Sequence, residues 1–595
     1  MGHTFHIPVL GLAFSIDTPL KVARYGISSV VSIVDDILIE RMRKFYTAEL
    51  GETFIPISSK IPDFRAKRIT AYLNLLKEIV NRQFDLVKNS DFIPGSEISK
   101  YFDLLPERSS LKELYNTMLN TSDLGVKKNL QSKLRNRMYC GFIDVNIMSK
   151  VDKVNYDLNG DSLGEQFTDA LAALRGFAQS DLNSSLILSA GMNPKLYGSL
   201  EGFMDFYPNA KQELRKRIVL KVSDFRSAFI QAKFLAKKGL WISEFRVESG
   251  LNCGGHAFAT EGFLLGPILE EFKQKRQEMT DSLFEIYQTA IWNKNLNIIE
   301  IPEQRITVQG GIGTAKENSF LIDNYKLDGT GWGSPFLLVP EATNVDKDTL
   351  DALVVATHDD FYISGSSPLG IPFNNFRKSS AEALRLERIR KGRPGSPCKK
   401  KYLVSNTEFT DQPICTASRE FQNLKIKELE KKFLPKAEYK QQYDLIIEKV
   451  CLCDGLATSA YIKNDMLKPR ENRAVAICPG PNLAYFSESF TLEEMVKHIY
   501  GEVNLMHEAG RPNLFINELH LYIDCLKKDI SQHMGQLSEK KHKYFIKFKE
   551  QLQRGIGYYK ELIPQLFNET ERYKEKMLNE LLKIEQTLNN LVWIG

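Results

Sequence analysis

The sequence predicts an α/β fold built on a closed parallel (β/α)8 barrel, and three observations support this. Short runs rich in β-branched residues alternate with longer helical stretches, most runs end in glycine or a polar residue, and glycine-rich segments accompany the last two runs. Such alternation is typical of parallel sheets, and the loops after strands seven and eight of these barrels commonly hold a phosphate. One barrel of about 250 residues leaves much of the 595-residue chain for other parts.

Eight runs are candidate strands, and their spacing divides the chain. They span residues 7–13, 28–34, 141–148, 184–189, 217–222, 243–248, 305–309 and 331–339. Residues 37–137, between the second and third runs, have helical periodicity and are predicted to form a helical insertion. The predicted domains are a barrel at 1–375, a cysteine-containing linker or cover at 376–490 and a helical region at 491–595.

Composition and charge limit the classes of protein to which this chain is expected to belong. A net charge of +5 over the whole chain does not favour a nucleic-acid partner, and 43% hydrophobic residues suit a globular protein. No apolar run has the length that crossing a membrane needs, and the first residues lack the layout of a secretory signal. We therefore expect a cytoplasmic protein without membrane contact. Its C-terminal helices are expected to cover the barrel or to mediate homo-oligomer formation.

Two glycine-rich segments form the predicted cofactor phosphate site. One follows the seventh run, from Gln309 to Thr314, and the other lies at the eighth, from Asp328 to Phe336. Glycines permit a close approach of the backbone, so that several N–H groups can face an anion. The first segment contains Gly310, Gly311 and Gly313, and the second contains Gly333 and Ser334.

Two side chains are candidates for catalysis. His256 follows the sixth run in Cys253-Gly254-Gly255-His256, where the glycines leave room around an imidazole that can act as an acid or a base near neutral pH. Lys221 ends the fifth run and could stabilise negative charge on a reduced cofactor, or simply extend from its strand towards solvent. Cys253 is interpreted as a small buried residue, with a redox thiol as the alternative.

Taken together, these segments resemble the nitronate monooxygenase family, formerly called 2-nitropropane dioxygenases, which includes the FMN-dependent enoyl-acyl carrier protein reductase II enzymes. Residues 8–13, 141–148 and 189–194 are similar to the first, third and fourth strands of that family, and Gly254-Gly255-His256 is similar to its catalytic motif. The resemblance implies an FMN-dependent oxidoreductase in which Asn146 contacts the flavin, His256 assists proton transfer and the glycine-rich loops hold the phosphate. The predicted cofactor-binding set is completed by Gly11, Ala13, Ser189, Lys221 and Gly255.

The resemblance covers the barrel alone and leaves the substrate open. The helical insertion, Asn252-Cys253 and some two hundred C-terminal residues depart from the pattern of the family. The expected partners are a small-molecule or acyl substrate and an electron donor, either a nicotinamide or a redox protein. Monooxygenase and reductase activity both stay open. The alternative is a non-catalytic barrel that serves as a binding or assembly protein.

Five of the eight cysteines lie close together in sequence after the barrel: Cys398, Cys415, Cys451, Cys453 and Cys478. Thiolates in turn-rich segments can ligate an iron–sulfur cluster or zinc. Their spacing matches no standard motif, because it includes no Cys-x-x-Cys pair. A metal site and a compact domain with packed cysteines both stay open. Asp35 and Asp36, after the second run, could serve as acids or metal ligands, although acidic pairs at the start of a loop more often cap helices.

Overall fold

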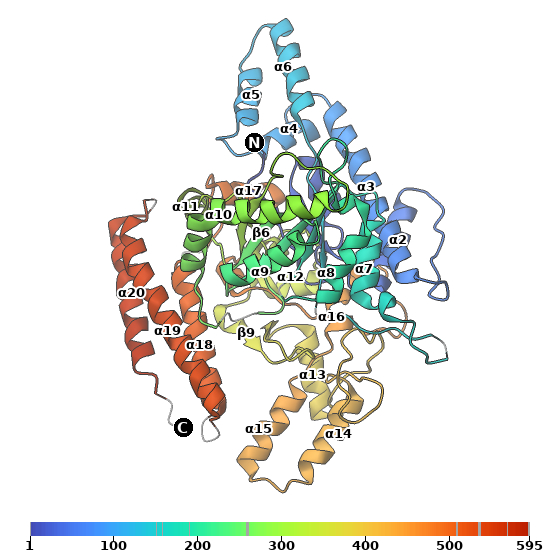
Figure 1. Cartoon of the computed structure of the whole chain (residues 1–595), viewed down its shortest axis with the longest axis vertical. Coiled ribbons are helices and arrows are strands. Elements are labelled where there is room, and N and C mark those ends of the chain that lie inside the picture. Colours follow the sequence, from blue (N-terminus) through green and yellow to red (C-terminus); the bar gives the residue numbers. More distant parts are fainter. Residues whose placement is uncertain are drawn as a thin grey trace.

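The computed structural model describes residues 2–149, 151–157, 159–189, 191–257, 261–506, 510–533, 537–567 and 569–592. Ala190, in the fourth-strand motif, lies outside these residues. Eight parallel strands close into a barrel, helices pack around it, and helical extensions project from it in three directions (Figure 1). The predicted fold class is confirmed.

The strands follow one another around the barrel in sequence order, and β8 closes the sheet against β1. They are β1 (Phe5–Ile7), β2 (Ser28–Ser32), β3 (Ile143–Ile147), β4 (Ser184–Leu188), β5 (Lys216–Val222), β6 (Ile242–Glu248), β7 (Arg305–Gln309) and β8 (Gly329–Gly331). Because side chains alternate along a strand, every second residue faces the barrel interior.

The first and last strands differ from their predicted positions, and proline explains both. β1 ends at Ile7 because Pro8 has no N–H to donate to a neighbouring strand. The expected strand at 331–339 is instead a three-residue strand followed by a 3₁₀ helix, Ser334–Leu338, in whose first turn Pro335 lies. The apolar residues of this helix are as buried as those of a strand, so their hydrophobicity alone predicted the wrong element.

Helices connect the strands. Between most strands there is a single main helix, and these are α1 (Thr18–Val22), α7 (Asp169–Ala178), α8 (Pro194–Ser199), α9 (Phe225–Ala236), α10 (Leu265–Trp292) and α11 (Ala315–Tyr325), while α12 (Lys347–Val354) follows β8. Between β2 and β3 lie α2 (Asp36–Glu49), α3 (Phe64–Asn89), α4 (Glu97–Asp103), α5 (Ser110–Leu119) and α6 (Leu124–Arg137). α3 packs against α7, whereas α5 and α6 project away from the barrel (Figure 1). Asp35 accepts hydrogen bonds from the backbone N–H groups of Ile37 and Leu38, and so caps α2 as predicted.

The part of the chain after the barrel is mostly helical. An antiparallel pair, β9 (Phe361–Ser364) and β10 (Phe373–Phe376), precedes α13 (Ser380–Arg390), α14 (Arg419–Glu430), α15 (Lys436–Ile447) and α16 (Leu452–Lys463). The C-terminal helices are α17 (Leu492–Tyr500), α18 (Leu514–His533), α19 (Glu539–Leu562) and α20 (Glu571–Asn589). One hydrophobic core runs from Phe5 in β1 to Leu588 in α20, so the three predicted domains share a core and their boundaries stay a prediction. None of the helices in the described ranges combines the length and apolar character needed to cross a bilayer.

Candidate functional site

A ring of polar side chains lies at the C-terminal ends of four barrel strands. Asn146 (β3), Lys221 (β5), Glu248 (β6) and Gln309 (β7) each occupy an inward-facing position, whereas neighbours such as Val145 belong to the outer hydrophobic core. Lys221 Nζ lies 2.7 Å from Glu248 Oε2, and Gln309 Nε2 donates to Glu248 Oε1 at 2.9 Å. The ring therefore carries a fixed cation, a fixed anion and two amides at the end of the barrel where ligands bind.

Sequence analysis found two members of this polar ring and missed the other two. Asn146 and Lys221 were predicted, while Glu248 and Gln309 were treated only as strand residues. A period-two count identifies them, because Lys221, Glu248 and Gln309 are each the last inward-facing residue of their strands.

One side of the polar ring contains buried polar atoms without a partner. Gln309 Oε1 and His6 Nε2 make no hydrogen bond of normal geometry to any residue in the described ranges. Both lie beside Gly331, whose missing side chain leaves the space between them. Burial, followed by the positive charge of Arg246, lowers the pKa of His6 to about 3, so this imidazole is neutral at physiological pH.

The glycine-rich loop after β7 has the backbone geometry of an anion-binding loop. Gly310 and Gly311 have φ values of 98° and 77°, in the left-handed region that favours glycine. In the described part of the chain, no hydrogen bond uses the backbone N–H of Ile312 in this loop, or of Gly333 and Ser334 after β8. All three residues are buried. Buried N–H groups without an acceptor are rare, so these three are the strongest sign of a ligand site at the predicted phosphate loops.

Other predicted phosphate contacts are already used by the chain itself. The backbone N–H groups of Gly313 and Thr314 donate to Glu317 Oε2 at 2.9 and 3.3 Å, and Glu317 Oε1 lies 2.6 Å from Arg511 Nη1. The Arg511 guanidinium packs so closely on Gly313 that a Cβ there would lie 2.7 Å from it. The Gly313 N–H is therefore already used by a carboxylate of the chain, and its predicted contact with a phosphate stays a prediction.

The Ser334 hydroxyl is also committed within the chain. It donates to the Cys253 carbonyl oxygen at 3.0 Å and accepts from the Gly480 N–H at 2.7 Å. Of the groups by which Ser334 could contact a phosphate, only the backbone N–H is not used within the chain. Cys253 lies against Gly333, and burial, followed by the charge of Glu248, raises the pKa of its thiol. A neutral, buried thiol supports the interpretation of Cys253 as a packing residue.

His256 is held by the segment that covers the barrel mouth. Its Nε2 lies 2.7 Å from Ser367 Oγ, and its ring packs edge-on against Phe373 with centroids 5.1 Å apart. The Gly255 N–H donates to the Cys478 carbonyl oxygen at 3.0 Å, which fixes the loop that carries the histidine. Cys478, which sequence analysis assigned to a linker or cover, thus forms part of the wall of this site.

The remaining predicted cofactor contacts make hydrogen bonds or packing contacts within the protein itself. The Ala13 N–H donates to the Leu456 carbonyl oxygen at 3.2 Å, so α16 covers the chain just after β1, and Gly11 packs beside the same leucine. Ser189 Oγ donates to the Ile147 carbonyl oxygen at 3.1 Å. Gly11, Ala13 and Ser189 are therefore near the mouth, but their polar groups or close surroundings are used by the protein.

The five clustered cysteines do not form the predicted metal site. Cys398 and Cys415 share a thiol hydrogen bond and Cys453 and Cys451 lie near them, but Cys478 contacts the His256 loop instead. Within the described ranges, no three His, Cys, Asp or Glu side chains converge as metal ligands would. The structure therefore does not bring Cys398, Cys415, Cys451, Cys453 and Cys478 together as one set of ligands, because the chain places the last cysteine in a different contact.

Cys398 is expected to react with iodoacetamide about tenfold faster than Cys453 near pH 7. The hydrogen bond from the Cys415 thiol lowers the pKa of Cys398, which is partly exposed, whereas burial raises the pKa of Cys453. Mass spectrometry of peptides after brief labelling measures both rates. Equal labelling of the two thiols would contradict this assignment.

Comparisons with known proteins find distant structural similarity only. No family model and no curated protein matches the chain. Among solved structures, FabK from Thermotoga maritima is 12% identical with a TM-score of 0.29, over 64% of this chain and 82% of that one. The enoyl reductase domain of MlnA from Bacillus amyloliquefaciens is 12% identical with a TM-score of 0.34, over 76% and 89%. Nitroalkane oxidase from Streptomyces ansochromogenes is 9% identical with a TM-score of 0.33, over 84% and 94%. These values are too low to transfer a cofactor or a substrate to this chain.

Proposed function

We propose that this protein is an FMN-dependent oxidoreductase whose cofactor lies across the C-terminal end of the barrel. The observation that carries the proposal is the set of buried, unpartnered backbone N–H groups of Ile312, Gly333 and Ser334 in the two glycine-rich loops. These donors suit a phosphate, because backbone N–H groups in such loops are common phosphate ligands. The proposed substrate is a small or acyl compound, and the type of chemistry is that of enoyl reductases or nitronate monooxygenases.

The remaining chemistry of the site suits a flavin ring. Asn146 and Gln309 offer amide groups, and Lys221 offers a positive charge at the same rim of the barrel. When bound, FMN supplies the transfer of hydride or electrons, which no amino-acid side chain provides. The protein then has to orient the cofactor, place a cation beside the developing negative charge and exclude water.

In this proposal His256 holds or moves the proton. Its Nε2 is paired with the Ser367 hydroxyl, so a proton can be exchanged along this hydrogen bond while the ring stays fixed against Phe373. Glu248 holds Lys221 at the same rim of the barrel, which would place the ammonium group of Lys221 beside the flavin ring. Both carry the roles that sequence analysis gave them as candidate catalytic residues.

The first test is the absorbance spectrum of the purified protein, with analysis of any chromophore released on denaturation. We expect flavin bands and released FMN, or uptake of added FMN by the apoprotein. Because the N–H groups would bind the phosphate, FMN should bind about 100-fold more tightly than riboflavin. A colourless protein that takes up neither compound would exclude this function.

A pair of variants separates the phosphate site from general damage to the loop. Ser334→Asp and Ser334→Asn both remove the hydroxyl that bonds to Cys253 and Gly480, and the two new side chains are equal to each other in size. Only aspartate adds a negative charge beside Gly333. Ser334→Asp should weaken FMN binding at least tenfold more than riboflavin binding. Ser334→Asn should change both affinities alike.

A binding or assembly protein is the second candidate function. It is favoured because the chain itself occupies donors and space at the barrel mouth. Leu456 accepts a hydrogen bond from the chain just after β1, Glu317 accepts one from the glycine-rich loop after β7, and the Gly480 N–H donates to Ser334. Failure to bind any flavin, with the fold intact, would move this candidate to first place.

A further inference from the structure

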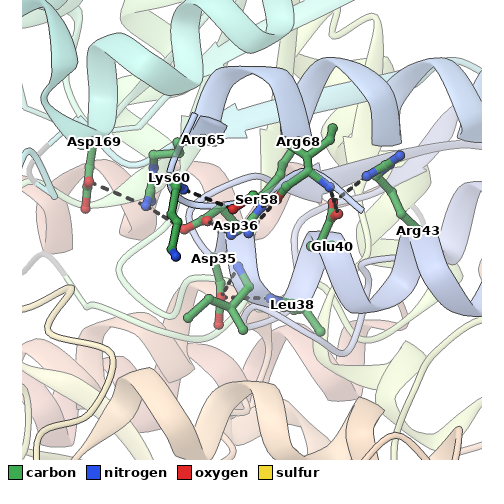
Figure 2. Close-up of polar contacts among 12 residues, drawn as sticks. Asp35, Asp36, Leu38, Glu40, Arg43, Ser58, Lys60, Arg65, Arg68 and Asp169 are labelled. Carbon is green, nitrogen blue, oxygen red and sulfur yellow. Dashed lines mark hydrogen bonds and ion pairs between the residues drawn. The ribbon is translucent and has the colours of Figure 1, made fainter. Parts of the chain in front are cut away.

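A basic cleft lies beside the barrel, away from the glycine-rich loops. It has a volume of about 500 Å³ and is bordered by the first turns of α2 and α3, the chain after β3 and a segment around Tyr402. Asp36, at its edge, directly follows the C-terminal end of β2. Figure 2 shows Asp36 with Arg65 and Arg68, which line the cleft.

Positive charge dominates the lining of this basic cleft. Its cations are Arg41, Lys44, Arg65, Arg68, Lys153, Lys400 and Lys468. The only acidic residues in the lining are Asp36 and Glu40. Such an excess at an enclosed surface attracts anions and raises their local concentration.

Internal ion pairs neutralise only part of this charge. Asp36 is shared by Arg65 and Arg68 at 2.8 and 2.7 Å, and Arg65 also lies 3.4 Å from Asp169. Arg41 is paired with Glu471 at 2.5 Å, and Lys400 with Asp35 at 2.5 Å. No ion pair within the described ranges involves Lys44, Lys153 or Lys468, the other three cleft lysines. Four carboxylates are paired with cations of the cleft, whereas its lining carries seven cations, so the basic cleft stays positive.

Two guanidinium groups of the cleft, one buried (Arg65) and one half-buried (Arg41), also have an unused donor each. Arg65 is 6% exposed, and its Nε has no hydrogen-bond acceptor in the described part of the chain; the same holds for Nε of Arg41. A buried charged donor without an acceptor is costly, and an anion bound in the adjoining cleft would offset part of that cost. Guanidinium groups bind phosphate oxygens with matching geometry, which sets the chemistry of that ligand.

Aromatic rings form part of the walls. Arg65 and Lys153 lie over the Tyr402 ring at 5.1 and 5.9 Å, and Phe54 and Phe64 also border the space. A second cavity of about 370 Å³ shares Arg41 and Lys400 with the first and adds further cations. The combined shape suits a small organic molecule with more than one anionic group better than an extended polymer, because its buried arginine is reached only inside a cavity.

We infer that this basic cleft binds a small phosphorylated ligand that carries at least two negative charges, such as a nucleoside diphosphate. Lys44, Lys153 and Lys468, which no ion pair within the described ranges neutralises, bind its phosphate oxygens, and the guanidinium groups of Arg41, Arg65 and Arg68 supply the surrounding positive charge. The site is separate from the proposed flavin site and does not depend on it.

Isothermal titration with pyrophosphate, ADP and sulfate at equal ionic strength tests this inference. Pyrophosphate and ADP should bind with one-to-one stoichiometry and at least tenfold more tightly than sulfate. Lys153→Gln and Lys44→Gln should each weaken pyrophosphate binding about tenfold, because each removes an unpaired cation without breaking an internal ion pair. Lys347→Gln, at a lysine on α12 that is 82% exposed and outside the cleft, should leave it unchanged.

Three results would overturn the inference: equal binding of sulfate and pyrophosphate, equal binding by the wild type and the two cleft variants, or tighter binding of an RNA oligonucleotide than of ADP at the same residues. The Ser334→Asp variant distinguishes this site from the flavin site. It should bind pyrophosphate as the wild type does, even if FMN binding is lost. Pyrophosphate binding by a protein that takes up no flavin would support the cleft and reject only the proposed oxidoreductase function.

Discussion

Replacing Arg511 with methionine is expected to lower the free energy of unfolding by about 3–5 kcal/mol. Arg511 is buried and lies 2.6 Å from Glu317 Oε1, and it also donates to Asn482 Oδ1 and to the Gly311 carbonyl oxygen. Methionine fills similar space but leaves the Glu317 carboxylate buried without its cation. Equilibrium denaturation in urea at pH 7 measures the change.

Two further variants identify the source of this loss. Arg554→Met, at an exposed arginine on α19, should change the stability by less than about 0.5 kcal/mol. The double variant Arg511→Met with Glu317→Gln should be more stable than Arg511→Met alone, because it removes the uncompensated charge. If the double variant is no more stable, the loss comes from packing and not from the buried carboxylate.

Lys221→Met is expected to make the midpoint potential of the bound flavin more negative by about 30–60 mV, which corresponds to about 1.5–3 kcal/mol for a two-electron couple. The reason is that Lys221 is the cation of the polar ring, and a nearby cation favours the more negative reduced state. Photoreduction against a reference dye measures the potential in the protein loaded with FMN.

The conservative variant provides the control for this prediction. Lys221→Arg keeps the positive charge next to Glu248 and should keep most of the potential, whereas Lys221→Met should not. A structural role for Lys221 would lower FMN content without moving the potential of the flavin that remains bound. An unchanged potential in Lys221→Met would show that this cation lies away from the flavin.

The central barrel strands could be predicted from the sequence because their signal is local. Runs such as those of β3 and β5 combine apolar residues with period-two alternation, and both lie where they were expected. The errors at β1 and β8 come from Pro8 and Pro335, which end or redirect the backbone within runs that are otherwise strand-like. Hydrophobicity describes burial well in both places but does not specify the backbone conformation.

The site was predictable only where neighbouring residues define it. The glycine-rich loops and His256 belong to short motifs, and the structure places them at the barrel mouth. Arg511 and Gly480 could not be assigned, because each meets its loop from more than a hundred residues away in sequence. The same distance explains the cysteines: their proximity in sequence predicted one cluster, but Cys478 passes to the His256 loop instead.

The glycine-rich loops are held by Arg511 and Gly480, which follow them far along the chain, and this affects when the loops become fixed during synthesis. Gly311 is synthesised two hundred residues before Arg511, which donates a hydrogen bond to its carbonyl oxygen. At ordinary rates of translation this interval lasts about 10–40 s. During that time the nascent barrel can close its strands, but its ligand loops lack the residues that fix them. Cofactor capture is therefore expected to follow the emergence of α18 from the ribosome, so the holoprotein forms late in its own synthesis.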